Sequence, residues 1–463
     1  NMQDQYTEHS LQRLTLTMVL LNAFTTPLML SAVNVALPAI AKDLSMNAVQ
    51  LSWVPMAYLM ASAMFVLIFG RLADMVGRKR IFLIGTSSVI VTSLIGAFSD
   101  SSAMLISARF LQGVSAAMLY ATQVAIVTSV FPPAKRGQAI GLTVSTIYLG
   151  LTIGPVIGGY VIDTFGWRAC FMVHIPLAVI VLCLGAFFVK GEWSADERGS
   201  FDLLGAIMYS FSILLLCLGV SWLSSNLSYI SLAVSIIGLI FFFFFENVHK
   251  HPIFDVNLFF TNRVFTFSCL ASLIIYTATF ANVVQVSLYL QYLKGMSATV
   301  AGLIMMCQPL TMAIFSPLAG RLSDRFEPRR LASLGMAISC GGLILLSNLR
   351  TDSSLTYLVL ALVFTGLGFS LFSSPNVNAI MSSVEKRSFG SANGVMATMR
   401  IVGQMTSMVL VTLIFTIVIG SVEIGVSNYD DLEKAIRLTF TIASMLCLPG
   451  LYFSLARGKM RTS

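Results

Sequence analysis

The sequence predicts an all-α integral membrane protein, built as two six-helix halves with an additional pair of helices between them. Three observations predict this class: an apolar composition, the spacing of long apolar runs, and a loop motif that occurs twice. Of the 463 residues, 57% are hydrophobic and only 10% are charged, and the mean hydropathy is +0.86. Such a composition is typical of helices that face lipid, and it excludes an ordinary water-soluble domain.

Long apolar runs divide the chain into about fourteen transmembrane helices, because a helix needs about 20 residues to cross the hydrocarbon core of a bilayer. Prolines within the first run obscure where that helix ends. We expect spans near 14–40, 49–70, 81–98, 103–131, 138–162, 169–189, 203–222, 228–247, 265–291, 299–319, 331–348, 355–380, 389–420 and 433–456.

The basic residues predict the orientation in the membrane. If the N-terminus is cytoplasmic, the loops and tails on that side hold most of the 28 Lys and Arg residues, and an acidic loop (Glu423, Asp430, Asp431 and Glu433) lies on the other side. By the positive-inside rule we expect a multi-pass protein of the bacterial inner membrane with both termini in the cytoplasm. The net charge of +8 then reflects the basic residues that orient the chain in the membrane. No nucleic-acid partner is expected, because the charges are spread over many short loops.

A basic loop motif occurs twice and predicts an internal duplication. GRLADMVGRKR at 70–80 returns as GRLSDRFEPRR at 320–330, and KRGQAIGLTVST at 135–146 returns at nearly the same offset as KRSFGSANGVMAT at 386–398. The repeats predict an N-terminal half at 1–190, an inserted helix pair with linkers at 191–262, and a C-terminal half at 263–463. Two parallel copies of this kind suggest a transporter with its site between the halves, near the middle of the membrane.

Further motifs carry a resemblance to a known family along nearly the whole chain. They are VNVALPAI (33–40), ARFLQGVSAA (108–117), GLTIGPVIGGY (150–160), LYLQYLKGMSATVAG (288–302) and SSPNVNAIMSSV (373–384), in that order. With the basic loops, they resemble the fourteen-helix drug:proton antiporter family of the major facilitator superfamily. The resemblance implies the major facilitator fold and a monomer. It also implies multidrug-type efflux: alternating access that exports amphipathic small molecules by proton antiport.

The basic loops are candidate gate elements. Glycines let helix ends approach closely, and an aspartate there can cap the next helix or pair with an arginine, while the basic cluster lies at the anionic leaflet. The resemblance makes the first copy a cytoplasmic gate brace between core helices two and eleven; the alternative is a loop that only sets topology. Glu327 and Pro328 make the second copy less regular. The gate residues are Gly70, Asp74, Gly77, Arg78, Gly320 and Asp324.

The fifth predicted span carries a face of small residues. Gly150, Gly154 and Gly158 recur at every fourth position, with Gly159 beside them and Pro155 as a kink. Small residues at this spacing permit close helix contact, and the proline frees a backbone carbonyl. The resemblance makes this the antiporter motif; the alternative is plain close packing.

Charged residues inside spans are the candidates for proton coupling. Arg109 and Arg400 lie within predicted spans, where a charge is functional by default, and the resemblance assigns Arg109 to proton handling; Arg400 is equally compatible with a structural role. The sequence departs from the family pattern in LMLSAVN (28–34), where Met29 replaces the usual aspartate, and no acidic residue lies mid-span by our assignment. His174, where the family usually has Asn, is the remaining titratable candidate, although a lone histidine is more often structural.

The polar residues expected to line the cavity are neutral or positive, which favours a neutral or anionic amphipathic substrate. The alternative for each of them is a hydrogen bond between helices. Abundant Met and Phe, 24 and 33 residues, can supply an adaptable apolar surface. The expected cavity residues are Asn34, Arg109, Tyr120, Gln123, Tyr148, His174, Asn282, Gln285, Tyr289, Asn376, Asn378 and Arg400.

Other functions stay open at this level. A second carrier hypothesis is a proton-independent facilitator, or a dedicated exporter of one metabolite, siderophore or lipid. A receptor or scaffold on a transporter fold is the least favoured non-enzymatic possibility. An enzyme is not expected, because the sequence shows no metal-ligand cluster, phosphate loop or nucleophile elbow, and the seven cysteines have no paired or metal spacing. We therefore expect no metal and no cofactor, and a small amphipathic substrate, protons and the lipid bilayer as partners.

Overall fold

The computed structural model describes residues 2–194, 201–221, 226–249, 252–253, 256–384 and 389–458. Within these ranges the chain is helical apart from short connections and one isolated antiparallel bridge between Asn47 and Glu423. Fourteen helical segments of the described chain are long and apolar enough to cross a membrane. The predicted all-α membrane class and the number of spans are therefore confirmed.

The N-terminal six spans begin with a helix that continues through two prolines. Its bounds exceed the predicted 14–40, because Pro27 and Pro38 lie inside the helix and do not end it. The sixth span consists of three short helical segments in series. The elements are α1 (Met2–Asp43), α2 (Ala48–Val76), α3 (Arg78–Ala97), α4 (Ser102–Val130), α5 (Pro133–Phe165), η1 (Trp167–Phe171), α6 (Ile175–Cys183) and η2 (Leu184–Phe188).

The remaining eight spans include two that are each broken into shorter helices. The inserted pair is α7 (Leu203–Ser221) and α8 (Asn226–Val248), followed by the short α9 (Val256–Thr261). The last six spans are α10 (Arg263–Thr279) continuing into α11 (Ala281–Leu288) and η3 (Tyr289–Leu293), α12 (Ala298–Met305) continuing into α13 (Cys307–Arg325), α14 (Pro328–Ser347), α15 (Leu355–Ser382), α16 (Phe389–Val418), and η5 (Val426–Asn428) with α17 (Tyr429–Ala456).

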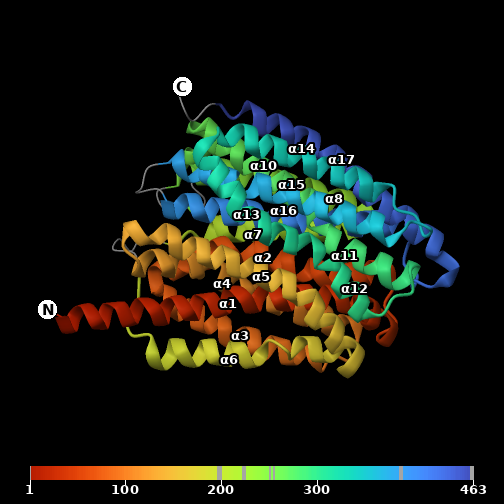
Figure 1. Cartoon of the computed structure of the whole chain (residues 1–463), viewed down its shortest axis with the longest axis horizontal. Coiled ribbons are helices and arrows are strands. Elements are labelled where there is room, and N and C mark those ends of the chain that lie inside the picture. The colour runs from red at the N-terminus through yellow and green to blue at the C-terminus, as the bar shows by residue number, and fades with distance from the viewer. Residues whose placement is uncertain are drawn as a thin grey trace.

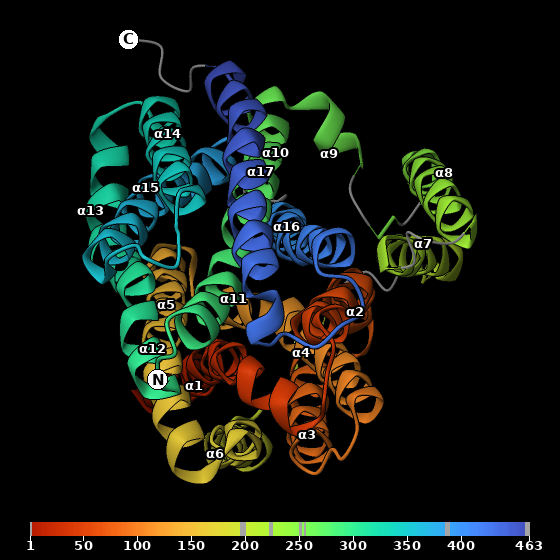
Figure 2. The same ribbon diagram turned by 90° about the vertical axis from the view of Figure 1, so that its right-hand side faces the viewer.

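The first six and last six spans repeat the same helix pairing. In the first group α1 packs on α5, and α4 packs on α2 and α3; in the second, α10 packs on α16, and α15 packs on α13 and α14. The groups meet along two contacts, α2 with α16 and α5 with α12 (Figure 2). The inserted helices α7 and α8 pack on each other and lie outside this arrangement, beside α2 and α16.

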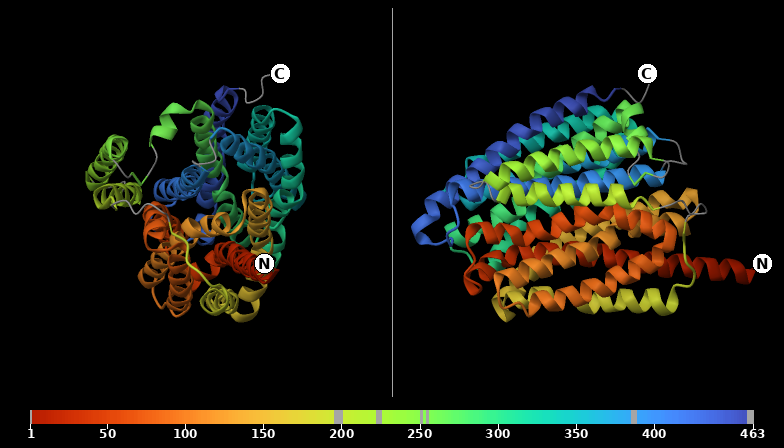
Figure 3. Two further views of the ribbon diagram at one scale, coloured as in Figure 1. Left: turned by 90° about the vertical axis from the view of Figure 1, so that its left-hand side faces the viewer. Right: turned by 180° about the vertical axis from the view of Figure 1, so that it is seen from behind.

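The two ends of the bundle differ in their connections. The start of α1 and the end of α17 lie at one end of the bundle (Figures 1 and 3), and the α2–α3 and α13–α14 connections with their basic loops lie there too, so we call it the basic end. At the opposite end, called the far end below, several helices start with a side-chain cap. Asn47, Ser101 and Ser354 accept a hydrogen bond from a backbone N–H of the first turn of α2, α4 and α15, which stabilises these starts.

Candidate functional site

A cavity of about 630 Å³ lies between the two halves. Its wall contains residues of α1, α2, α4 and α5 on one side and of α10, α11, α13, α15 and α16 on the other, and it reaches the basic end at Gly70, Arg71 and Asp74. Aromatic side chains supply much of the wall. They include Tyr120, Tyr148, Tyr276, Phe280, Phe369 and Phe372.

Five of the predicted cavity residues line this space: Tyr120, Gln123, Tyr148, Asn282 and Arg400. Most are also hydrogen-bonded to neighbouring helices. The Tyr120 hydroxyl lies 3.0 Å from that of Tyr58, Gln123 Oε1 accepts from Asn22 Nδ2 at 3.2 Å, and Asn282 Nδ2 donates to Gln308 Oε1 at 3.4 Å. The Tyr148 hydroxyl lies 3.3 Å from Ser373 Oγ and so links α5 of one half to α15 of the other.

Arg109 lies about two turns after the start of α4 and does not line the cavity. It is fully buried; its Nε donates to the Val54 carbonyl at 3.1 Å, and Nη1 donates to Gln112 Oε1. Its guanidinium stands 4.5 Å from the centre of the Tyr58 ring. A cation in this position is held by carbonyl and amide oxygens and by a ring face.

The polar contacts of Arg109 continue through Gln112 to His174. Gln112 Nε2 donates to Ser93 Oγ at 2.7 Å, and Ser93 Oγ lies 3.0 Å from His174 Nε2. Gln112 Nε2 also lies 2.9 Å from the sulfur of Met29, at the position where the family usually has aspartate. Met29 therefore faces this buried cluster and not the cavity. His174 is fully buried and lines only a small separate void.

The other predicted cavity residues lie between helices in this conformation. Asn34 is buried in α1 and Gln285 donates to Thr439 Oγ1 at 3.0 Å. Tyr289 donates to the Arg350 carbonyl at 2.7 Å, near the far end. Asn376 Nδ2 donates to Ser272 Oγ at 2.8 Å, and Asn378 Nδ2 donates to Ser323 Oγ at 3.1 Å. For Gln285, Tyr289, Asn376 and Asn378 the structure shows the hydrogen-bonding arrangement that the sequence left open as the alternative, whereas Asn34 Oδ1 is buried without a hydrogen-bond partner.

The glycine face of α5 lies against α1, as its spacing predicts. A Cβ atom added at Gly150 would stand 2.5 Å from the Phe24 carbonyl oxygen, one at Gly154 would stand 2.7 Å from Ser31 Cβ, and one at Gly158 would stand 2.7 Å from Ala32 Cα. Two of these obstacles are backbone atoms, which cannot move aside as a flexible side chain can. The face therefore holds α1 and α5 at a separation that larger residues would not allow.

Gly159 serves a different contact, between the two halves at the far end. A Cβ atom there would overlap the Ala298 carbonyl at the start of α12, and one at Gly302 would overlap the carbonyl of Pro155. Beside them, the backbone N–H of Thr299 donates to Asp163 Oδ2 at 2.8 Å. The proline-bearing turn of α5 and the first turn of α12 therefore pack backbone to backbone.

Three further hydrogen bonds join the halves at the far end. Gln291 Nε2 donates to the Val35 carbonyl at 2.8 Å, and Ser52 Oγ lies 2.9 Å from Thr412 Oγ1. The backbone N–H of Ala48 donates to the Val422 carbonyl at 2.9 Å. Both lines of contact between the halves are thus closed at this end.

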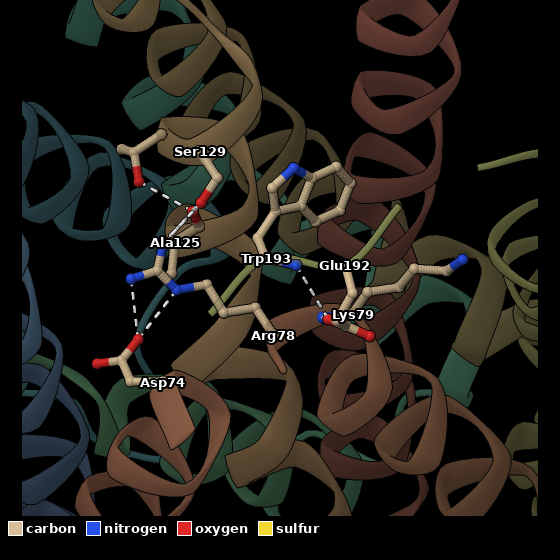
Figure 4. Close-up of polar contacts among 8 residues, drawn as sticks. Asp74, Arg78, Lys79, Ala125, Ser129, Glu192 and Trp193 are labelled. Carbon is tan, nitrogen blue, oxygen red and sulfur yellow. Dashed lines mark hydrogen bonds and ion pairs between the residues drawn. The ribbon is translucent and has the colours of Figure 1, made fainter. Parts of the chain in front are cut away.

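The first gate loop holds its charges within the N-terminal half (Figure 4). Arg78 forms an ion pair with Asp74, with Nη2 and Nε 2.9 and 3.0 Å from Oδ1. Arg78 Nη1 also donates to Ser129 Oγ at 2.6 Å and to the Ala125 carbonyl at 3.4 Å, so the pair ties the end of α2 to α4. Gly70 and Asp74 border the mouth of the cavity.

Glu192 completes this loop, and sequence analysis did not single it out. Its Oε1 accepts from the backbone N–H of Lys79 at 2.8 Å and its Oε2 from that of Arg80 at 3.2 Å, so the carboxylate caps the start of α3 (Figure 4). A carboxylate is favourable there because it satisfies orphan N–H groups at the positive end of the helix dipole. Gly77 is required beside it: its φ is +127°, and an added Cβ would stand 2.5 Å from the Glu192 carboxyl carbon.

The second gate loop is less constrained. Gly320 lies in α13, and no atom would crowd a Cβ added there. The side chain of Asp324 lies outside the described part of the structure, as do those of most residues in the 135–146 and 386–398 motif starts. The loop itself is joined to α17 by a hydrogen bond of 3.4 Å from Arg329 Nη1 to the Leu455 carbonyl.

Two sets of buried charges were also missed. Arg457, expected in a cytoplasmic tail, is 1% exposed; Nη1 donates to Asn376 Oδ1 at 2.7 Å and to Ser268 Oγ at 3.0 Å. Burial lowers the pKa of Arg457 to about 10, so it remains a cation near pH 7. At the base of the inserted pair, the carboxylates of Asp202 and Glu246 both lie against Gly205, and both residues are buried. These two clusters are recognised only because their residues lie close together in space, which the sequence does not show.

Comparison with known proteins identifies the family. Residues 19–255 and 268–462 match the family model described as Major Facilitator Superfamily. The chain belongs to the major facilitator superfamily. Its fourteen spans fit the fourteen-helix drug:proton antiporter type within it.

Several relatives are named as transporters. The riboflavin transporter RibZ of Clostridioides difficile is 32% identical over 370 residues, which cover 80% of this chain and 81% of that protein. The multidrug resistance protein Stp of Mycobacterium tuberculosis is 31% identical over 379 residues, 80% of this chain and 70% of that protein. A crystal structure of a POT family transporter with a thioalcohol-conjugated peptide shares the fold, with a TM-score of 0.73 at 15% identity over 96% of each chain. This major facilitator chain is therefore a multi-pass secondary transporter.

Proposed function

We propose that this protein exports amphipathic small molecules from the bacterial cytoplasm by alternating access, in exchange for protons. The observation that carries the proposal is the cavity of about 630 Å³ between the halves, which reaches the basic end and is closed at the far end. This volume suits a drug-sized ligand, and an aromatic wall with a few polar groups suits an amphipathic one. The name of the relative Stp, a multidrug resistance protein, supports the same class of substrate.

In this proposal the basic end faces the cytoplasm, and the protein is open to the cytoplasm. The basic loops at both gates support this orientation through the positive-inside rule. Cysteines introduced at Arg71 and Arg321 should react with a membrane-impermeant maleimide in inverted vesicles and not in intact cells. Reaction in intact cells would reverse the orientation and turn the proposed exporter into a candidate importer.

Proton coupling is supported by the position of His174. Its hydrogen-bonded cluster leads through Gln112 to Arg109, whose guanidinium stacks on Tyr58, and the Tyr58 hydroxyl meets that of Tyr120 on the cavity wall. A change of charge at this histidine would therefore act on groups in contact with the cavity. Arg109 cannot itself supply the switch near neutral pH, because a guanidinium does not release its proton there.

The test is flux in proteoliposomes with and without an imposed pH gradient. We expect transport to accelerate when the gradient drives protons against the substrate, and His174→Asn to flatten the pH dependence of transport while substrate binding persists. Wild-type flux that ignores the gradient would refute proton antiport. A normal pH profile in His174→Asn would leave antiport intact and remove only the role of this histidine.

A proton-independent facilitator, or an exporter dedicated to one metabolite, siderophore or lipid, is the second candidate. One observation favours it: among the described residues of the cavity wall, Asp74 is the one carboxylate, and it is paired with Arg78 at the mouth. The relative RibZ, named as a riboflavin transporter, supports a dedicated substrate. Equal flux in both directions without a gradient would favour the facilitator. A receptor or scaffold would show no flux at all.

A further inference from the structure

Arg400 is a cation on the cavity wall with no hydrogen-bond or ion-pair partner among the described residues. It lies mid-way along α16 and is partly exposed to the cavity. The buried arginines Arg109 and Arg457 differ, because each donates to several oxygens in its own half. A guanidinium near the middle of a membrane protein is costly unless something neutralises or solvates it.

Aromatic side chains of both halves line the cavity wall that holds this cation. The guanidinium carbon lies 5.9 Å from the centre of the Tyr120 ring, which belongs to α4 of the opposite half. Tyr148 of α5 and Tyr276 of α10 line the same cavity. Gln404, one helical turn after Arg400, adds an amide to the same wall.

Among the described residues of the cavity wall, no free carboxylate stands as a counter-ion for this arginine. Asp74 is the one carboxylate among the described wall residues, and its Oδ1 already accepts from both Nε and Nη2 of Arg78. That pair is further held by Ser129 on α4, at the mouth of the cavity. Releasing Asp74 to Arg400 would therefore leave Arg78 without its partner.

We propose that Arg400 and the tyrosines Tyr120, Tyr148 and Tyr276 form a binding site for amphipathic aromatic acids. The planar guanidinium presents a fork of N–H donors that matches a carboxylate or sulfonate, and the rings offer faces and edges to a flat conjugated body. The inference rests on the proposed function, since it takes the cavity as the substrate site. It narrows the class of substrate from neutral or anionic amphiphiles to aromatic anions.

The site also joins the two halves through its ligand. Arg400 and Tyr276 belong to the C-terminal half, and Tyr120 and Tyr148 to the N-terminal half. An acid that accepts from Arg400 while its ring lies against Tyr120 contacts both rocking bodies at once. Its binding can then favour the conformation in which the halves close around it, which is how a substrate shifts the equilibrium between two states.

Two fluorescent probes with the same ring system test the site: 8-anilino-1-naphthalenesulfonate, which is anionic, and N-phenyl-1-naphthylamine, which is neutral. Binding to the purified full chain in a neutral detergent is measured by titration. We expect wild type to prefer the sulfonate, and Arg400→Gln to weaken sulfonate binding by about tenfold or more while binding of the neutral probe is unchanged. Arg400→Lys, which keeps the charge but loses the fork, should fall between the two.

Arg437→Gln is the matched control, because it removes one positive charge at the far end, where Arg437 donates to the Ser347 carbonyl at 3.2 Å and does not line the cavity. Arg437→Gln should bind both probes with wild-type affinity. Equal affinity of wild type for the two probes, or a retained preference in Arg400→Gln, would overturn the inference. Because binding is measured without flux, a wild type that prefers the sulfonate but fails to transport it would refute export and leave the site intact.

Discussion

The two ends of the bundle hold the halves by different physical means. At the far end the halves touch through backbone: Gly159 and Gly302 let α5 and α12 approach until carbonyls occupy the space of a side chain, and neutral hydrogen bonds such as Gln291 to Val35 lie beside them. At the basic end the strong contacts of the first gate loop do not reach the C-terminal half: Arg78 pairs with Asp74 inside the N-terminal half, and Glu192, in the linker just after it, caps the start of α3.

This difference shows how one conformation can be preferred without being locked. The far-end contacts depend on shape, are short in range and are lost together when the helices separate. Asp74, Arg78 and Glu192 at the basic end keep their partners while the cavity is open there, so opening costs these groups little electrostatic energy. Alternating access requires two states whose free energies differ by only a few kcal/mol. Short-range packing at the far end and paired charges at the basic end can keep the two states this close in free energy.

The largest expected effect comes from filling the far-end contact. Gly302→Ala places a methyl group on the Pro155 carbonyl, so α12 must move away from α5 and the far end can no longer close. We expect transport to fall by about tenfold or more, since overpacking of a rigid contact costs about 1–3 kcal/mol. Gly341→Ala is the matched control, because its nearest obstacle is 3.6 Å away, on the Phe364 ring.

The reporter for this prediction is a cysteine placed at Thr299, beside the same contact. Its reaction rate with an impermeant maleimide should rise in the Gly302→Ala background and stay unchanged with Gly341→Ala. If transport and reactivity are the same in both glycine variants, the far-end packing does not control closure.

A change inside one half should have a different signature. Gly154→Leu pushes against Ser31 Cβ, 2.7 Å from the added Cβ, and so separates α1 from α5 within the N-terminal half. We expect the protein to insert but to lose thermal stability and transport together, because one of the two moving bodies is distorted. The reactivity of the Thr299 cysteine should change less than with Gly302→Ala. A larger change would mean that the glycine face also controls closure between the halves.

Much of the fold follows from the sequence because it depends on period and length alone. Apolar runs of bilayer length and the doubled basic loop predict fourteen spans, arranged as two copies of six with an inserted pair, and the spacing of Gly150, Gly154 and Gly158 predicts a close helix contact. The position of a side chain around its helix is harder to predict in membrane proteins, because lipid and packed protein are both apolar. Arg109 and Arg400 both lie within spans, yet one is enclosed and the other faces the cavity.

Glu192 and Arg457 were missed for a related reason. Each lies just outside a span, where charges are ordinary, and each acquires its role from a partner distant in sequence: the start of α3 for Glu192, and Asn376 with Ser268 for Arg457. Composition near a membrane surface predicts orientation. It does not predict which charges are enclosed.

At the basic end, Asp74→Asn tests the ion pair of the gate loop. The pair is partly exposed, with side chains 36% and 23% accessible, so its loss should cost no more than about 1 kcal/mol. We expect transport to fall severalfold with normal membrane insertion, and the deficit relative to wild type to shrink at high salt, which screens the pair in the parent protein. Asp100→Asn is the control: that carboxylate is 92% exposed and 4.0 Å from Arg168. Wild-type flux in Asp74→Asn would leave the loop with a role in topology only.

The smallest expected effect belongs to Glu192→Gln, which asks whether the linker after the sixth span contributes to the gate. A glutamine amide oxygen can still accept from the N–H of Lys79, so one of the two capping hydrogen bonds is kept. The variant loses the negative charge beside the helix N-terminus and Arg80, which stabilises a partly exposed site of this kind by about 0.3–1 kcal/mol. Transport should therefore stay closer to wild type than in Asp74→Asn, while Glu192→Ala, which leaves both N–H groups without this acceptor, should lose more. The thermal stabilities of Glu192→Gln and Glu192→Ala distinguish the contribution of the hydrogen-bonded cap from that of the negative charge. If Glu192→Gln is as impaired as Glu192→Ala, the negative charge of Glu192 carries the effect. If neither variant differs from wild type, the linker lies beside the gate loop without supporting it.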